Sequence, residues 1–120
     1  VDPPCYVQET PPFSPLAAVE KVKGAPIPTA YTLEQNYPNP FNPNTTITYS
    51  VPKLSKVTIR VYDMLGRHVA TLVDHFQQAG TYIAKWDGKD RFGRQVTSGL
   101  YFYRLESGNP VITKKMLLLE

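Results

Sequence analysis

Two carboxylates lie close to two glycines in the segment DGKDRFG at residues 87–93, a combination that also occurs in calcium-binding loops. An EF-hand loop needs oxygen ligands at fixed offsets, a central glycine and a distal glutamate. That spacing is not met here, and Lys89 and Arg91 bring positive charge to the place of a cation. A tight structural turn is therefore the favoured interpretation of this segment.

The residue types that most often carry catalysis or bind metals lack partners at the required spacing. His68 and His75 have no third ligand at metal-binding spacing, and no serine lies in a Gly-x-Ser-x-Gly nucleophile elbow. The single cysteine, Cys5, stands in a proline-rich stretch without a histidine beside it, and one cysteine forms no internal disulfide. We predict that the chain is not an enzyme and that it uses no metal or other cofactor.

Aromatic side chains on a flat face would instead indicate a carbohydrate-binding module. The only tryptophan, Trp86, is in phase with Tyr82 in an alternating segment, so we expect it in the core of a sandwich. Tyr62, Phe76 and Phe92 are the remaining candidates for an exposed platform. This alternative requires that those rings share one face.

Composition and charge argue against several classes of protein. The chain has 120 residues, of which 42% are hydrophobic and 19% charged, as expected for one folded domain. Its net charge of +3 comes from basic residues scattered along the sequence, which argues against nucleic acid binding. The apolar run MLLL at residues 116–119 is far shorter than the roughly 20 residues that span a bilayer, so we expect no membrane-spanning segment.

The composition of the chain changes near Tyr31. Seven of the twelve prolines lie within residues 1–30, whereas six of the seven glycines lie after them. Proline fixes φ and removes a backbone donor, so we predict an extended proline-rich arm or linker at residues 1–30 and a folded domain at residues 31–120. Within the arm, residues 5–10 and 16–23 contain few enough prolines to form a strand.

From residue 31 onward, apolar and polar residues alternate, and turn residues separate the alternating runs. The expected strands lie at residues 31–34, 45–51, 56–63, 68–74, 80–86, 100–106 and 111–119. Strands of this number and spacing predict an all-β fold: a seven-stranded, immunoglobulin-like antiparallel β-sandwich preceded by the extended proline-rich arm.

The alternation also predicts which side chains form the core. In two expected strands, at residues 45–51 and 56–63, one face is apolar and the other polar. In the strand at residues 100–106 both faces are apolar, so we expect it to be central or covered on its outer side. The predicted core face of the first two strands consists of Ile47, Tyr49, Val51, Val57, Ile59 and Val61.

The last segment, KKMLLLE at residues 114–120, reads as a hydrophobic strand. A terminal strand is the easiest element to pair with another chain, because no following loop holds it back. The alternative is an ordinary closing strand of the sandwich.

Five motifs together resemble the type A C-terminal sorting domain of proteins exported by the type IX secretion system of the Bacteroidetes and related phyla. They are PNPF at residues 38–41, YDxxGR at 62–67, WDGxDxxG at 86–93, SGxYxYRL at 98–105 and KKMLL at 114–118. The chain also resembles the immunoglobulin-like domain of flagellar hook-capping proteins. Both resemblances imply a β-sandwich.

The resemblance implies a non-catalytic domain that sorts an exported protein and anchors it at the surface. It would pass through the periplasm of a Gram-negative bacterium, be recognised by the outer-membrane secretion machinery, and end up secreted or at the cell surface. By residue-to-residue transfer, the recognised surface would include Gly99, Tyr101, Lys114, Lys115, Met116, Leu117, Leu118 and Leu119.

A second hypothesis is a self-assembling subunit of an extracellular filament or surface layer. The arm would pack on a neighbouring copy by strand addition, and the terminal strand is another route to a homo-oligomer. Cys5 would be free to form an intermolecular disulfide in an oxidising environment. The arm residues expected to make these contacts are Cys5, Tyr6, Val7, Phe13 and Leu16.

Overall fold

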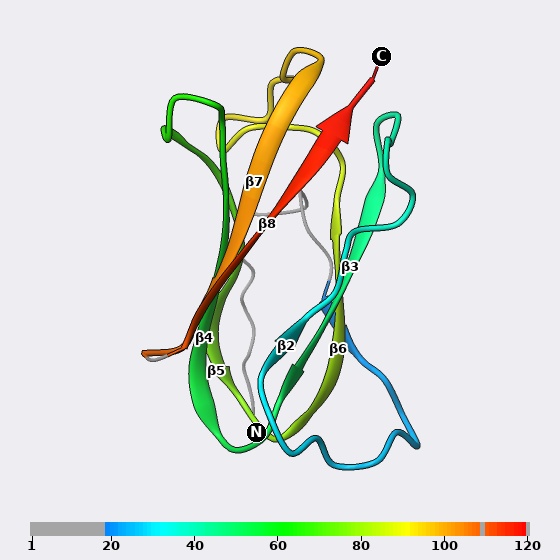
Figure 1. Ribbon diagram of the computed structural model, residues 1–120, viewed down its shortest axis with the longest axis vertical. Coiled ribbons are helices and arrows are strands. Elements are labelled where there is room, and N and C mark those ends of the chain that lie inside the picture. The colour runs from blue at the N-terminus through cyan, green and yellow to red at the C-terminus, as the bar shows by residue number, and fades with distance from the viewer. Residues whose placement is uncertain (1–18, 109, 120) are drawn as a thin grey trace, which may run out of the picture.

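The computed structural model describes residues 19–108 and 110–119. All eight regular elements in these residues are β-strands. Among the described residues there is no helix long and apolar enough to cross a membrane. The strands form two four-stranded antiparallel sheets that face each other (Figure 1). Sheet A has the order β1 (Val19–Lys21), β6 (Gly80–Trp86), β3 (Thr45–Val51) and β2 (Thr32–Leu33). Sheet B has the order β5 (His68–Gln77), β4 (Ser55–Tyr62), β7 (Gly99–Glu106) and β8 (Val111–Leu118).

The core lies between the two sheets and is built from the inward faces of alternating strands. All six residues predicted for the core face of β3 and β4 are buried, so this prediction is confirmed. Trp86 is also buried as predicted, and its ring centroid lies 5.7 Å from those of Phe41 and Tyr101. These three aromatic rings therefore join β6, β7 and the loop before β3 in one contact.

The order of the strands is that of an immunoglobulin-like sandwich. In the immunoglobulin nomenclature, sheet A contains strands A, B and E, which correspond to β2, β3 and β6. Sheet B contains strands C′, C, F and G, which correspond to β5, β4, β7 and β8. Near the start of β7, the Tyr101 hydroxyl donates to the carbonyl of Thr97 at 2.6 Å, as in the tyrosine corner of such folds. The predicted all-β, antiparallel sandwich is confirmed.

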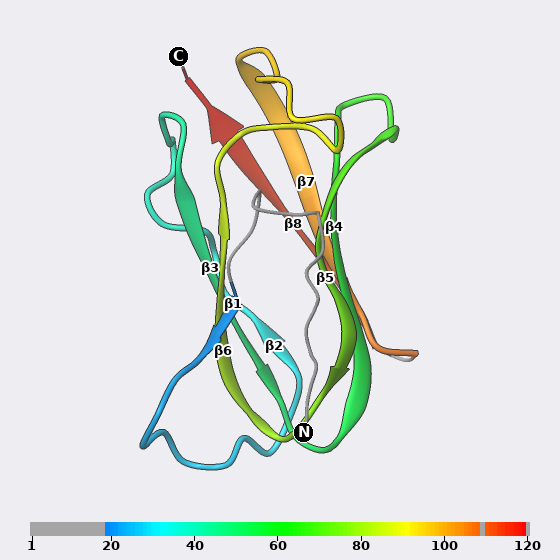
Figure 2. The same cartoon turned by 180° about the vertical axis from the view of Figure 1, so that it is seen from behind.

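The predicted number of seven strands is too low by one. The additional strand, β1, lies within residues 1–30 and pairs antiparallel with β6 at the edge of sheet A (Figure 2). β1 lies within residues 16–23, where the sequence permits a strand, but three residues are too short to show a period of two, so its pairing with β6 has no signal in the sequence. Its position depends on tertiary contacts, because the Lys21 side chain packs against Gly80 and over the Tyr82 ring. The five arm residues named above lie outside the described residues.

The side chain of Tyr103 connects the two sheets next to β8. Its hydroxyl donates to the carbonyl of Glu34 at 2.7 Å and accepts from the backbone N–H of Asn36 at 2.8 Å. Burial of the ring raises the pKa of Tyr103 to about 12, so the hydroxyl stays protonated and keeps its donor. This pair of bonds holds the segment after β2 against sheet B, where it reaches the edge of β8.

Candidate functional site

The terminal strand β8 closes one edge of sheet B and pairs only with β7 among the named strands. Successive side chains of a strand point to opposite faces, and β8 follows this rule. Met116 and Leu118 are fully buried in the core, whereas Lys115 and Leu117 are exposed on the outer face of the sheet. Met116 and Leu118 thus hold the strand in the sandwich, whereas Lys115 and Leu117 are presented to solvent.

The backbone of β8 is likewise divided between two sides. In an antiparallel pair, alternate residues direct both their N–H and C=O groups to the same neighbour. In β8 the odd-numbered residues direct these groups away from β7. On that side the Phe41 N–H donates to the Leu117 carbonyl at 3.0 Å, and the Leu119 N–H donates to the Phe41 carbonyl at 2.9 Å. A loop far away in sequence therefore occupies the end of this edge.

Two side chains from the same loop complete the occupation. The Leu117 N–H donates to Oδ1 of Asn39 at 3.0 Å, and Nε2 of Gln35 donates to the Lys115 carbonyl at 2.7 Å. We call residues 35–41 the edge cover. It satisfies the outward backbone groups of β8 from the Lys115 carbonyl to the Leu119 N–H.

Of the eight residues that the resemblance implied for recognition, seven lie on β7 and β8 and Leu119 directly follows β8, but their side chains face two ways. Gly99 pairs with Leu118 at the end of the ladder, so it lies beside the C-terminal end of β8. The core-facing side chains are those of Tyr101, Met116 and Leu118. The side chains that reach solvent are those of Lys114, Lys115, Leu117 and Leu119.

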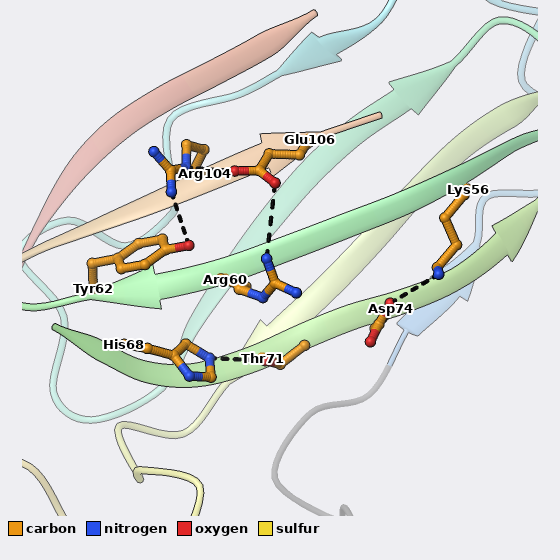
Figure 3. A network of polar contacts seen from close by, with 8 residues as sticks. All are labelled: Lys56, Arg60, Tyr62, His68, Thr71, Asp74, Arg104 and Glu106. Carbon is orange, nitrogen blue, oxygen red and sulfur yellow. Dashed lines mark hydrogen bonds and ion pairs between the residues drawn. The ribbon is translucent and has the colours of Figure 1, made fainter. Parts of the chain in front are cut away.

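The outer face of sheet B carries a polar network beside these residues (Figure 3). The Arg104 guanidinium lies 4.7 Å from the Tyr62 ring centroid and donates to the Tyr62 hydroxyl at 3.0 Å. Glu106 forms ion pairs with both Arg104, at 2.9 Å, and Arg60, at 3.8 Å.

β7 is an inner strand of sheet B, between β4 and β8, which confirms the prediction made from its two apolar faces.

Two turns at the end of the sandwich have the same construction, which the repeated sequence D-x-x-G-R could have indicated. Asp63 accepts the N–H of Arg67 at 2.9 Å and pairs with its guanidinium at 2.9 Å. Asp90 accepts the N–H of Arg94 at 3.0 Å and pairs with its guanidinium at 3.5 Å. The interpretation of residues 87–93 as containing a structural turn is confirmed, because the Asp90 carboxylate is engaged within its own loop.

The pKa values of the carboxylates in these turns lie below the usual value for aspartate. The backbone N–H of Arg67 is the main group that lowers the pKa of Asp63, and the backbone N–H of Arg94 does the same for Asp90.

An open cavity of about 580 Å³ lies between the turns and is lined by His68 and Arg91 among others. Burial and the Arg91 charge lower the pKa of His68. Within residues 19–108 and 110–119, no group of three His, Cys, Asp or Glu residues could hold a metal ion.

The three rings considered for carbohydrate binding are not arranged as one platform. In the β4–β5 ladder Tyr62 pairs with His68, whereas Phe76 pairs with Lys56 at the other end. Phe92 lies in the loop before β7, and the Arg91 and Arg94 guanidinium groups lie 5.1 and 5.2 Å from its ring centroid. The structure gives this alternative no support.

Comparison with known proteins gives one family and seven similar chains of solved structure, two of which are PorZ and PorU. The family model described as "Secretion system C-terminal sorting domain" matches residues 35–119. A structure of PorZ, titled an essential surface component of the type-IX secretion system of Porphyromonas gingivalis, aligns with a TM-score of 0.51 and 19% identity, over 75% of this chain and 11% of that one. Dimeric latent PorU from the same organism aligns with a TM-score of 0.57 and 19% identity, over 92% of this chain and 10% of that one.

These structural matches establish a shared fold. The chain spans only about a tenth of the PorZ and PorU chains, 11% and 10% respectively. No curated protein is similar enough to count as a match.

The contact between Asn39 and β8 can be tested by Asn39→Ala. The loss of one hydrogen bond should lower the free energy of unfolding by about 0.5–1.5 kcal/mol and accelerate amide hydrogen exchange at Leu117. Asn44→Ala is the matched control, because Asn44 is exposed in the same region and its side chain has no hydrogen bond within the described residues. Equal exchange rates at Leu117 in both variants would contradict the role given to Asn39.

The two Asp turns predict a specific acid sensitivity. Because folding lowers both pKa values, the carboxylates stabilise the domain above their unfolded pKa of about 4, and this stabilisation is lost as the pH falls below it. The variant D63N/D90N should lose about 0.5–1 kcal/mol per turn at pH 7, and its stability should change less between pH 5 and pH 2 than that of the parent chain.

Urea unfolding across this pH range measures both effects. Asp74→Asn is the control, since Asp74 forms an exposed ion pair with Lys56 at 3.5 Å and belongs to neither turn. A pH dependence of D63N/D90N as steep as that of the parent would show that the two turns do not carry the acid sensitivity.

Proposed function

Since the chain belongs to the family of secretion system C-terminal sorting domains, whose model matches residues 35–119, we propose that it is the sorting signal of a bacterial protein exported by type IX secretion. The family resemblance inferred from the five motifs is thereby confirmed. In this proposal the folded domain leaves the periplasm with its cargo, is recognised by the outer-membrane secretion machinery, and ends at the cell surface or outside the cell.

The observation that carries this proposal is the two-sided construction of β8. Leu117 in β8 and Leu119 directly after it are 36% and 48% exposed, although the residues between and before them, Leu118 and Met116, are buried in the core. Exposed apolar side chains on a rigid strand present a defined surface to a partner without an ordering cost at binding. Lys114, Lys115 and Gly99 border this surface.

The buried members of the implied recognition set have a supporting role in this proposal. Tyr101 and Met116 are register partners, and Leu118 lies opposite Gly99. Their side chains fix which residues of β8 face outward, so a partner recognises them only through the geometry they impose. Recognition and surface anchoring of this kind need no catalytic group.

Assembly of an extracellular filament or surface layer through residues 1–30 is the weaker candidate. The strand in the described part of that arm, β1, pairs with β6 of the same chain in the order Val19–Ala84, Glu20–Ile83 and Lys21–Tyr82. A neighbouring copy would have to displace this strand before its own arm could add to the same edge. The occupied edge therefore favours export over assembly.

Export of a reporter protein fused in front of the domain tests the proposal in a bacterium that possesses a type IX system. We expect L117S/L119S to lower the amount of reporter at the cell surface at least several-fold, because it removes the exposed apolar side chains of the terminal segment. A truncation of residues 116–120 is less informative, since it also removes the buried Met116 and Leu118.

The matched control is L54S/F76S. Leu54 and Phe76 are 67% and 69% exposed, and they lie at the opposite end of sheet B from Leu117. Both double variants remove two exposed apolar side chains, so they separate a specific surface from general hydrophobicity. Unchanged reporter levels for L117S/L119S would refute recognition through this surface.

A further inference from the structure

The two outer strands of sheet B differ in how well they could accept an additional strand. The ladder between β5 and β4 has irregularities between Ile59 and Arg60 and between Val61 and Tyr62. Such bulges twist an edge and hinder the addition of another strand. β8 pairs with β7 over all eight residues from Val111 to Leu118 without a break. Its edge is therefore the regular one.

The edge cover occupies only the C-terminal half of β8. In the part of β8 before the edge cover, the backbone groups of Ile112 and Lys114 point toward β7. Because the direction alternates along the strand, the N–H and C=O of Thr113 and the N–H of Lys115 point away from β7. Within the described residues these three groups have no backbone partner. We call residues 111–115 the open edge. Unpaired groups on a regular edge are what strand addition uses.

A surface hollow and two positive charges lie at the open edge. The hollow has a volume of about 330 Å³ and is lined by Gln35, Phe102, Thr113, Lys114 and Lys115. Successive residues point to opposite faces of a strand, so the two lysines flank the open edge on both sides. Neither forms an ion pair within the part of the chain that the structure describes.

These charges distinguish between possible occupants of the open edge. A second copy paired through the same edge would bring its own Lys114 and Lys115 close to these two, and like charges across a strand pair are destabilising. A strand with carboxylate side chains at the facing positions would form opposite-charge pairs instead. Charge complementarity therefore selects an acidic partner over a second copy.

We propose that the open edge of β8 accepts an extended acidic segment of a partner protein as a fifth strand of sheet B. The backbone of Thr113 and the N–H of Lys115 hydrogen-bond to it, and Lys114 and Lys115 pair with its Asp or Glu side chains. This inference rests on the proposed sorting function, since it describes how the export machinery holds the domain.

Thr113→Pro tests the backbone part of the inference. Proline removes the outward N–H of Thr113 and leaves the hydrogen bonds to β7, and it is tolerated on edge strands whose N–H faces solvent. In the fused-reporter assay we expect export to fall about five- to tenfold, the effect of one hydrogen bond of about 1 kcal/mol or slightly more. Thr113→Val is the matched control, because it removes the hydroxyl but keeps the N–H, and its export should equal that of the parent.

Charge reversal tests the second part and is independent of any folding defect caused by proline. K114E/K115E should reduce export at least tenfold, whereas K114R/K115R should preserve it within twofold. Circular dichroism of the purified 120-residue variants checks that the fold is retained. If T113P loses its fold, the two lysine variants decide the outcome.

The combinations of results separate this inference from the proposed function. Loss of export in T113P and K114E/K115E, but not in their controls, supports an acidic added strand. Normal export in T113P or in K114E/K115E, with loss in L117S/L119S, overturns the inference and leaves the sorting function in place. Normal export in all three variants overturns this inference and also the proposed recognition through Leu117 and Leu119.

Discussion

The pairing register of β8 on β7 is the constraint on which the other features of this domain depend. Met116 lies opposite Tyr101 and Leu118 opposite Gly99, and this places both β8 side chains in the core. A slip by one residue would expose them and bury Lys115 and Leu117 instead, at a large desolvation cost for the lysine. The same register determines which backbone groups face outward, and therefore where the edge cover and the open edge lie.

The alternation of side chains along β8 therefore produces both the buried face and the exposed face of this strand. Burial of Met116 and Leu118 holds the strand without any contact from outside, so the outward residues are preorganised. The edge cover adds rigidity at the C-terminal end through Asn39 and Phe41, whereas residues 111–115 keep their outward hydrogen-bonding groups. A domain built in this way can be recognised by shape and charge alone, which is consistent with the proposed sorting function.

The sequence predicted those features that follow from local alternation. Residues 45–51 of β3 were located to the residue, because one face of that strand meets the core and the other does not. β1 lies within residues 16–23, where the sequence permits a strand, but Val19–Lys21 is too short to show a period, so its place beside β6 as an eighth strand was not predicted. The edge cover was missed for a related reason: Gln35 and Asn39 contact residues 80 and 78 positions away, respectively, and no local pattern records such a contact. The resemblance implied a single set of recognition residues, and only the structure shows that Tyr101 faces inward while Lys115 faces outward.

The central claim is that β8 is recognised while it remains paired with β7. Glu106 and Val111 are register partners at the outer end of the β7–β8 hairpin, and cysteines at such a position can form a disulfide that fixes the strand in place. The most direct measurement is export of the fused reporter by E106C/V111C, in a Cys5→Ser background, against each single-cysteine variant, with disulfide formation verified by gel mobility. We expect the disulfide-linked domain to be exported as well as the single variants. Loss of export in the linked domain alone would show that β8 must leave the sheet to be recognised, and would contradict this account.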